Sequence, residues 1–478
     1  AEGLLQLKND QFIKISSQFK GSSFSSNIYA MMPYDSHSML IATRGNGLFL
    51  YNHKTGTIES FVTSNDELMT SSAIYGGIVL QNGHFAINTL KKGVLIINKA
   101  GEIIRTIDNN SGLNTQNIRH IFQVSQGGLW LASNEGIYKV ALDIPLTFWD
   151  RNNGLYGSLN HMTEHGRNNF VATSTGVYIK QKDWFQKLKG IDTESWRFLA
   201  FNYKGIDKLL VATSDGVYEI RGRMAVKLTN QRATFIYVSP QIPNLIWVAE
   251  DDNLVFYRYV NGTLVKAGNH SQIKKSVIDI EEDHENNIWI GTSFDGVYKM
   301  NPPESIDSLL NQKLTAYSSN EGLKDIEEIR IETTNDSVVL LTGHKTYLYN
   351  QAENYFKLLF FNNSSKRGES QEIIFLDIDV DGNYWIQRNK KDYSLEFERT
   401  SIINKDTFLT ENIPFKLIPR KLARLVEKRE DGSFWILFND AIYRYDPNHY
   451  YLKEKQHNTL ITKLITNQDT VFYNALGN

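Results

Sequence analysis

Short apolar segments alternate with polar turns along almost the whole chain, and they recur in a fixed order. The clearest example is NNIWIGTSFDGVYKMN at residues 286–301, where an apolar segment ends in Gly291-Thr292 and the next begins at Gly296. Alternating apolar and polar positions rich in β-branched and aromatic residues predict strands, and a turn glycine permits the positive φ of a tight hairpin. We therefore expect a β-hairpin over these residues.

This hairpin recurs at intervals of roughly 40 residues, which is the signature of a repeat protein. Four strong copies are MLIATRGNGLFLYN (39–52), GLWLASNEGIYKV (128–140), NFVATSTGVYIK (169–180) and LLVATSDGVYEI (209–220). Weaker copies cover residues 85–98, 246–259, 338–350, 384–397 and 434–446. Each copy is preceded by a short apolar segment and followed by an aromatic one, so each repeat predicts four antiparallel strands. The exception is ESIDSLLNQ (304–312), where we expect a helical turn.

Four antiparallel strands in each repeat are typical of the blades of a β-propeller. Small residues such as Ala249 and Gly291 fit where inner strands converge on the ring axis. Large apolar residues just before such positions are expected to fill the space between blades; the tryptophans among them are Trp130, Trp247, Trp289, Trp385 and Trp435. A β-sandwich would also contain hairpins, but it explains neither the period nor the constant offset from tryptophan to glycine.

The repeats are too numerous for one ring, because single propellers have four to eight blades. We expect two rings of the seven-bladed type. Residues 1–151 would hold blades of a first ring that lacks its earlier blades, and residues 152–450 would form the second ring. Residues 451–478 would give a closing strand or the start of a tyrosine-rich immunoglobulin-like domain. The opposite division, with seven blades first and four at the end, stays open.

Composition excludes several classes of protein. The 478 residues include 51 Lys and Arg against 53 Asp and Glu, a net charge of −2, so no basic face for nucleic acid is expected. Cysteine is absent, which removes disulfides, thiolate metal sites and a cysteine nucleophile. No apolar run is long enough to span a bilayer. The chain opens Ala-Glu-Gly without a methionine or a signal peptide, so we expect that it is processed or trimmed.

The repeats resemble those of the two-component regulator propeller family. The likeness rests on residues 109–140 and on VIDIEEDHENNIWIGTSFDGVYKMNP, with their Trp-x-Ala/Gly-Ser/Thr and Gly-Ile/Val-Tyr elements. In that family the repeats form the extracytoplasmic sensor region of hybrid two-component systems, common in Bacteroidetes. Two seven-bladed rings are usually followed by the tyrosine-rich domain, a membrane helix and a signalling output. The resemblance therefore implies a periplasmic location, a homodimer in signalling, and membrane and output domains outside this sequence.

Motifs for catalysis and metal binding have simpler structural explanations. DIDVDGNYW (377–385) begins like a calcium loop of the EF-hand type, but Arg388 stands where that loop requires Glu. We interpret it as a blade hairpin with an Asp-Gly turn. The acidic stretch EEDHENN (281–287) is interpreted as a solvated turn. No metal-ligand spacing, nucleophile elbow or phosphate loop is present, so neither a catalytic residue, a metal nor a cofactor is expected.

A saccharide site needs aromatic faces beside planar polar groups, because sugars stack their C–H faces and hydrogen-bond at their edges. Propellers present ligands at a ring face, where inner strands begin. Three stretches fall at such positions: QNIRH (116–120), LNHM (159–162) and ESWRF (194–198). The candidate ligand-binding residues are Asn117, Arg119, Asn160, His161, Trp196 and Arg197. For each of them, packing between blades is the competing interpretation.

The function expected from these observations is ligand sensing without catalysis. As the resemblance implies, the region would recognise an oligosaccharide and transmit a conformational signal across the membrane. One alternative is a double propeller that serves as a scaffold in a secretion system and binds protein partners. A propeller enzyme, such as a lyase or a glycosidase, is a further alternative, but it would need converging acids or a metal at the ring centre.

Overall fold

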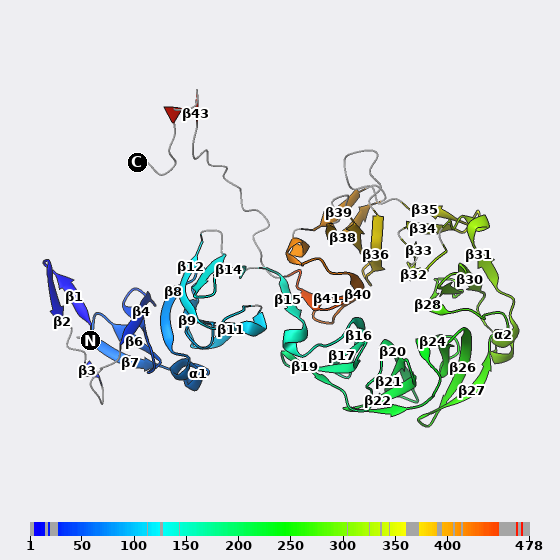
Figure 1. The fold of residues 1–478 in the computed structure, drawn as a ribbon, viewed down its shortest axis with the longest axis horizontal. Helices are drawn as coiled ribbons and strands as arrows, with labels where there is room; N and C mark the ends of the chain where they lie inside the picture. The colour runs from blue at the N-terminus through cyan, green and yellow to red at the C-terminus, as the bar shows by residue number, and fades with distance from the viewer. Residues whose placement is uncertain are drawn as a thin grey trace. The chain divides into compact units, whose positions relative to one another are not determined.

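The computed structural model describes residues 4–14, 18–19, 27–111, 113–124, 128–142, 144–303, 305–324, 326–334, 337–343, 345–359, 372–389, 394–404, 407–412, 414–448, 465–466 and 470–471. The chain forms two compact units, the first from residues 1–144 and 449–478 and the second from residues 145–448. Strands make up nearly all of the regular structure in both units (Figure 1), so the prediction of an all-β propeller fold is confirmed.

The second unit contains, within the described residues, seven antiparallel sheets of four strands each. The innermost strands are β16 (Leu159–His165), β20 (Ser195–Tyr203), β24 (Ala233–Val238), β28 (Val277–Glu282), β32 (Arg330–Thr333), β36 (Glu372–Ile378) and β40 (Ala423–Lys428). Each inner strand packs against the next, and β40 packs against β16, so the sheets close into a ring (Figure 1). The ring leaves no blade face without a neighbour.

The remaining strands of each blade follow outward from the axis. The second strands are β17 (Asn168–Thr173), β21 (Ile206–Thr213), β25 (Leu245–Glu250), β29 (Ile288–Thr292), β33 (Val338–Thr342), β37 (Tyr384–Asn389) and β41 (Phe434–Phe438). The third strands are β18 (Gly176–Gln181), β22 (Gly216–Arg221), β26 (Asn253–Val260), β30 (Val297–Met300), β34 (Lys345–Asn350), β38 (Leu395–Asn404) and β42 (Ile442–Tyr445). The outer strands are β19 (Trp184–Lys187), β23 (Met224–Lys227), β27 (Thr263–Asn269), β31 (Thr315–Tyr317), β35 (Tyr355–Leu358), β39 (Thr407–Glu411) and, in the last blade, β15 (Leu146–Trp149).

The last blade is completed by a strand from the beginning of the unit. β15 pairs antiparallel with β42, and the Trp149 ring stacks on Trp435 at 5.0 Å between centroids. This pairing covers an edge of β42 that would otherwise expose its backbone donors and acceptors. β15 lies before residue 152, where the repeat pattern placed the start of this ring. Of residues 451–478 the structure describes only β43 (Ile465–Thr466) and β44 (Thr470–Val471), so their assignment stays a prediction.

In five of the described hairpins, the hydroxyl of the recurring threonine donates to the carbonyl oxygen of the turn glycine and closes the turn. In the blade of β29 and β30, the Thr292 hydroxyl donates to the Gly296 carbonyl oxygen at 2.7 Å and accepts from the Asp295 backbone N–H at 3.0 Å. Gly296 has φ +78°, and a Cβ there would lie 2.3 Å from the Tyr317 carbonyl oxygen. Gly291 has a different reason: its Cβ would lie 2.3 Å from the Ile329 carbonyl oxygen of the next blade. Both glycines are therefore required by close backbone approach.

The tryptophans of the second strands fill the space between blades, with one exception. Trp247, Trp289 and Trp385 are fully buried, and Trp435 is nearly so. The Trp289 and Trp385 indoles each donate to an aspartate at the preceding turn, which satisfies a buried polar group. Trp130, expected to be buried in the same way, is 39% exposed. It lies in the sheet of β12, β13 and β14, the last of the three blades described in the first unit.

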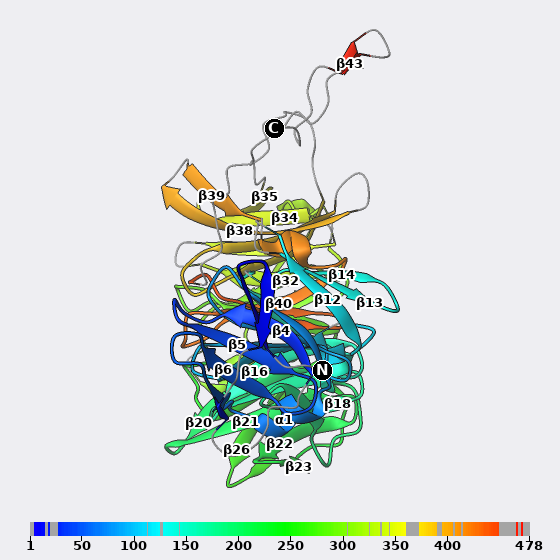
Figure 2. The ribbon, with the colours of Figure 1, turned by 90° about the vertical axis from the view of Figure 1, so that its left-hand side faces the viewer.

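The first unit has blades of the same kind. Its inner strands β4 (Ile28–Pro33), β8 (Ile74–Val79) and β12 (Ile118–Gln123) pack side by side (Figure 1), and Figure 2 shows β4 and β12 after a turn of 90°. The strands paired outward from them are β5 (Ser38–Thr43), β6 (Leu48–Asn52), β7 (Thr57–Phe61), β9 (Phe85–Thr89), β10 (Val94–Ile97), β11 (Ile103–Ile107), β13 (Leu129–Ser133) and β14 (Ile137–Val140). β3 (Gln18–Phe19) pairs parallel to β7, and β1 (Leu5–Lys8) forms a hairpin with β2 (Gln11–Lys14).

Helical segments are short and lie between strands. α2 (Ile306–Asn311) confirms the helical turn expected at 304–312, and the Ser305 hydroxyl caps its first turn by accepting from the Ser308 backbone N–H. α1 (Asp66–Ser71) was not expected from the sequence. The 3₁₀ turns are η1 (Asn109–Ser111), η2 (Arg151–Asn153), η3 (Ser319–Glu321) and η4 (Pro414–Leu417). No helix of the described residues is both long and apolar enough to cross a membrane.

Candidate functional site

A β-bulge occurs at the same place in most inner strands. In nine of those that the structure describes, the pairing with the second strand skips one residue near the start of the inner strand. The skipped residues are Tyr29, Tyr75, Arg119, Asn160, Trp196, Thr234, Ile278, Ile374 and Arg424. A bulge bends its strand and redirects a side chain, and bulges are common beside functional sites. These positions therefore present side chains at the beginnings of the inner strands.

The candidate residues from the sequence cluster at these bulges. Arg119, Asn160 and Trp196 are bulge residues, and His161 and Arg197 directly follow two of them. Asn117 lies just before β12. Asn117 and Arg119 belong to the first unit and the other four to the second, so the structure divides the candidates into two groups. Whether any of them binds a ligand stays a prediction.

Asn160 has a structural contact that accounts for its side chain. Its Nδ2 donates to the Ser195 carbonyl oxygen at 2.9 Å, which joins the first blade of the second ring to the next. Asn88 makes the same kind of bond in the first unit, from Nδ2 to the Ile118 carbonyl oxygen at 2.9 Å. For Asn160 the packing interpretation is therefore supported, and the amide nitrogen is already engaged.

His161 is partly buried and has an unpaired ring nitrogen. Its ring lies edge-on to Phe198, with centroids 5.9 Å apart. Burial, assisted by the nearby Arg197 charge, holds the pKa of His161 well below its usual range. Nδ1 is buried and has no hydrogen-bond partner. Since buried polar atoms are normally paired, this nitrogen is a candidate ligand contact.

Trp196 and Arg197 present an indole and a guanidinium on neighbouring residues. The Arg232 guanidinium lies over the Trp196 ring at 5.1 Å, and both side chains are partly accessible or exposed. The Arg197 guanidinium lies over the Phe235 ring at 4.3 Å. Arg197 also approaches two carboxylates, Nη1 to Asp279 Oδ1 at 3.9 Å and Nη2 to Glu281 Oε1 at 3.6 Å.

The partners of Arg197 belong to a group of acids on consecutive inner strands, which we call the axial acid cluster. Its members are Asp279 and Glu281 on β28, Glu332 on β32 and Asp377 on β36. Burial is the largest cause that raises their pKa values, to about 8 for Glu281 and about 7 for Asp377, and the neighbouring carboxylates add to the rise for Glu281. The pKa of Glu332 is also raised well above its usual range, by burial and then by three of these neighbours.

Two members of the axial acid cluster also tie blades together. Asp279 Oδ2 accepts from the Ile331 backbone N–H at 2.9 Å, and Asp377 Oδ2 accepts from the Val426 backbone N–H at 2.6 Å. Glu281 retains 35% of its side chain accessible to solvent, although protein surrounds it closely enough to raise its pKa. This combination fits a carboxyl that faces a narrow water-accessible space at the ring axis. The cluster offers hydrogen-bond acceptors beside one guanidinium and two aromatic rings.

Sequence reasoning missed this cluster. Glu281 was assigned with residues 281–287 to a solvated turn, but it lies inside β28, because the strand extends to Glu282 before the turn begins. Acids within otherwise apolar inner strands, as in VIDIEE, were the signal that could have revealed it. The interpretation of residues 377–385 as a hairpin agrees with the structure, since the Asp379 carboxylate accepts from Asp381 and Asn383 backbone N–H groups at the turn.

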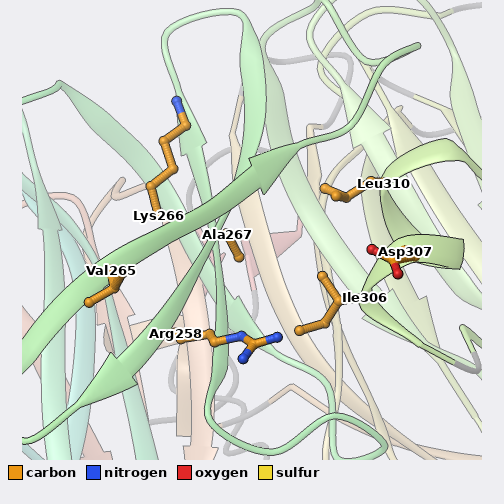
Figure 3. Close-up of a pocket in the computed structure, with 7 residues that line it drawn as sticks. All are labelled: Arg258, Val265, Lys266, Ala267, Ile306, Asp307 and Leu310. Atoms are coloured by element: carbon orange, nitrogen blue, oxygen red, sulfur yellow. The ribbon is translucent and has the colours of Figure 1, made fainter.

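Metal binding has no support in the described part of the chain, where no group of three or more acidic or histidine side chains could hold an ion. A separate hollow of about 510 Å³ lies between β27 and α2 (Figure 3). Its lining residues are Arg258, Val265, Lys266, Ala267, Ile306, Asp307 and Leu310. It is open, sits away from the inner strands, and includes none of the candidate residues.

The comparisons with known proteins agree with the propeller geometry. Residues 271–294 match the family model of the two component regulator propeller, which confirms the resemblance for that repeat. The extracellular domain of the hybrid two component system BT3049 from B. thetaiotaomicron is 17% identical, with a TM-score of 0.61 over 88% of this chain and 62% of that one. The extracellular domain of BT4673 from the same organism is 14% identical, with a TM-score of 0.52 over 99% and 65%.

At these identities the likeness shows a shared fold. The chain spans less than two thirds of the length of both structures. No curated protein sequence matches it.

Proposed function

We propose that this chain is the extracytoplasmic ligand-sensing region of a signal-transduction regulator and that its ligand is an oligosaccharide. The matched regulator repeat and the propeller fold shared with two extracellular domains support the sensor assignment. The location would be periplasmic, and the region would act without catalysis. Signalling would involve a homodimer and further domains that cross the membrane and carry the output.

The observation that carries the saccharide proposal is the grouping of Trp196, Arg197 and the axial acid cluster at the inner strands of the second unit. Indole and phenyl faces suit the C–H faces of sugars, while the guanidinium and carboxyl groups suit their hydroxyls. Arg197 connects the two sets, because it lies over Phe235 and near Asp279 and Glu281. A saccharide in this place would contact several blades at once.

Signal transmission requires that the ligand favour one arrangement of the protein over another. A ligand that binds both arrangements equally shifts nothing, however tightly it binds. A saccharide held between inner strands of different blades would favour the arrangement in which those strands are correctly spaced. The same coupling would then change the arrangement of the domains outside this sequence.

The test is a thermal-shift screen against dietary and host oligosaccharides, followed by calorimetric titration of any hit. We expect one class of glycan to raise the unfolding temperature and Arg197→Gln to weaken its binding at least 10-fold. Arg151→Gln, which removes an exposed positive charge in η2 of the same unit, is the matched control and should bind normally. Absence of binding by any glycan, together with tight binding to a secretion protein, would instead support the scaffold alternative.

A further inference from the structure

The first unit contains a row of neighbouring arginine and tyrosine side chains. It consists of Arg44, Tyr29, Tyr75 and Arg119, in that order, and we call it the Tyr–Arg ladder. The two tyrosine rings are 5.5 Å apart between centroids. The Arg44 guanidinium lies 5.7 Å from the Tyr29 centroid, and the Arg119 guanidinium lies 5.5 Å from the Tyr75 centroid. A positive charge therefore stands at each end of an aromatic pair.

The β-bulges create this ladder. Tyr29, Tyr75 and Arg119 are the skipped residues of β4, β8 and β12, three inner strands that pack side by side. In a regular strand successive side chains alternate between opposite faces, whereas a bulge redirects the extra residue. Because the three bulges occupy the same position, the three redirected side chains fall in one row.

Two glycines after Tyr75 allow neighbouring side chains to pack closely against the backbone of β8. A Cβ on Gly76 would lie 2.6 Å from Asn88 Oδ1, and a Cβ on Gly77 would lie 2.9 Å from Met32 Sδ on β4. The same Asn88 donates to the Ile118 carbonyl oxygen, directly before Arg119. The backbone on both sides of the ladder is thus fixed by packing and hydrogen bonds within and between the blades.

The ladder leaves its charges available. Arg44 and Arg119 are exposed, and within the described residues neither forms an ion pair with a carboxylate. Arg44 Nη1 donates to the Tyr29 hydroxyl at 3.1 Å, which orients the guanidinium. Glu135 is the nearby acid, and its pKa is lowered mainly by the Thr115 hydroxyl, with Arg119 a lesser cause.

Stability alone gives little reason for such an arrangement. Exposed cation–π pairs contribute only about 0.5–1 kcal/mol each, and arginine loses side-chain entropy when it is held in one place. What the ladder does provide is preorganisation, since the tyrosine rings place two forked donors beside each other before any ligand arrives. Guanidinium groups bind carboxylates and sulfates through paired hydrogen bonds.

We propose that the Tyr–Arg ladder is a binding site for an acidic oligosaccharide, with anionic groups of the sugar chain on Arg44 and Arg119 and sugar rings along the accessible edges of Tyr29 and Tyr75. This proposal rests on the proposed saccharide-sensing function and adds the charge class of the ligand and a site in the first unit. Carboxylated and sulfated sugars share the required chemistry, so the experiment distinguishes them.

The experiment is calorimetric titration of the full chain with tetragalacturonate, with its fully methyl-esterified form, and with a sulfated oligosaccharide of the same length. We expect one of the two anionic ligands to bind and the neutral ester to bind at least 10-fold more weakly. Arg44→Gln and Arg119→Gln should each weaken anionic binding about 10-fold, and Arg119→Lys should restore it only in part because lysine lacks the fork. Affinity should fall with added salt.

Two further variants separate a binding role from a structural one. Tyr75→Phe keeps the ring and should retain most of the affinity, whereas Tyr75→Ala should lose the support of Arg119. Lys54→Gln, which removes an exposed charge at the β6–β7 turn of the same unit, is the matched control. Unchanged unfolding temperatures would show that the arginine variants fold normally.

The outcomes distinguish this proposal from the proposed function. Binding of anionic and neutral glycans with equal affinity, or anionic binding that is insensitive to Arg44 and Arg119, would overturn the ladder site and leave saccharide sensing intact. A ladder that binds inorganic sulfate as tightly as the oligosaccharide would also overturn it. If no glycan binds to either unit, both proposals are overturned.

Discussion

Glu281 lies near the axis of the second unit, and its neighbours shift its pKa in opposite directions. Burial and the neighbouring Asp279 charge raise its pKa to about 8, while Arg197 lowers it in part. Asp377 is shifted in the same direction, to about 7, with burial as the first cause. The folded chain therefore holds more protons on these carboxyls than the unfolded chain between about pH 4.5 and 8. Stability from this source is complete at low pH and is lost as the pH rises through that range.

The predicted consequence is a fall in unfolding temperature of the second unit between pH 5 and pH 9 that Glu281→Gln makes smaller. The neutral amide removes the cost of ionising a carboxyl beside Asp279 and Glu332, so the variant should gain roughly 1–3 °C at pH 9 relative to the wild type. Glu430→Gln, which removes an exposed acid of the same unit, is the control. An equal pH slope in both variants would show that Glu281 ionises freely in the folded protein.

Two glycines with the same φ allow the cost of a steric clash to be separated from the cost of placing alanine in this backbone conformation. Gly296 and Gly382 both have φ +78°, but an added Cβ meets the Tyr317 carbonyl oxygen at Gly296 and no atom within 4 Å at Gly382. We expect Gly382→Ala to lower the free energy of unfolding by about 1 kcal/mol and Gly296→Ala by about 3 kcal/mol. Denaturant titration measures both. Equal losses would mean that the end of β31 moves aside without cost.

Strand β15 has a clear role at the scale of secondary structure. It supplies the outer strand of the last blade, and its Trp149 stacks on Trp435. A segment that begins at residue 152 would keep the repeats of the second unit but lose this strand. A segment that begins at residue 145 would retain it.

We predict that residues 145–448 form a soluble, cooperatively unfolding protein and that residues 152–448 aggregate or unfold at least 5 °C lower. The shorter segment would expose the edge of β42 and uncover Trp435, which is a known route to association between sheets. Thermal unfolding and size-exclusion chromatography compare the two. Similar behaviour of both segments would show that β15 is dispensable for closure.

The sequence predicted those structural features that depend on residues close to one another in the chain. The Thr292–Gly296 hairpin and helix α2 follow from turn and capping chemistry within a few positions. The pairing of β15 with β42 could not be read locally, because nearly 300 residues separate the two strands. Trp130 matches the repeat pattern but is exposed, because a tryptophan is buried between blades only when a neighbouring sheet packs against it.

The sequence pointed to residues at the starts of the inner strands, but it did not reveal which side chains surround them. Placement of candidates at inner-strand starts led to Arg119, Trp196 and Arg197, which lie at or beside the bulges. The partners of these residues on other blades were missed. Tyr75 reaches Arg119, and Asp279 approaches Arg197, only after the sheets pack. A bulge leaves no reliable mark in one sequence, so the row formed by Tyr29, Tyr75 and Arg119 became visible only in three dimensions.

At the scale of the whole molecule, each unit has its own core. Every cluster of buried apolar residues in the described chain lies within one unit, as with Leu40 and Phe85 in the first and Trp247 and Ile290 in the second. Separate cores predict separate unfolding, so calorimetry of the full chain should resolve two transitions. Gly296→Ala identifies one of them, because it should lower only the transition of the second unit.

This separation allows a ligand to be assigned to a unit without a structure of the complex. A ligand that binds only the folded state stabilises it by about 2.7 kcal/mol at 100 times its dissociation constant. If an acidic oligosaccharide occupies the Tyr–Arg ladder, it should raise the temperature of the transition that Gly296→Ala leaves unchanged. Arg119→Gln, with binding about 10-fold weaker, should cut the stabilisation at the same ligand concentration to about 1.4 kcal/mol. A rise confined to the other transition, sensitive to Arg197→Gln, would place the acidic sugar at the inner strands of the second unit instead. Because the two variants lie in different units, the same titration separates these results.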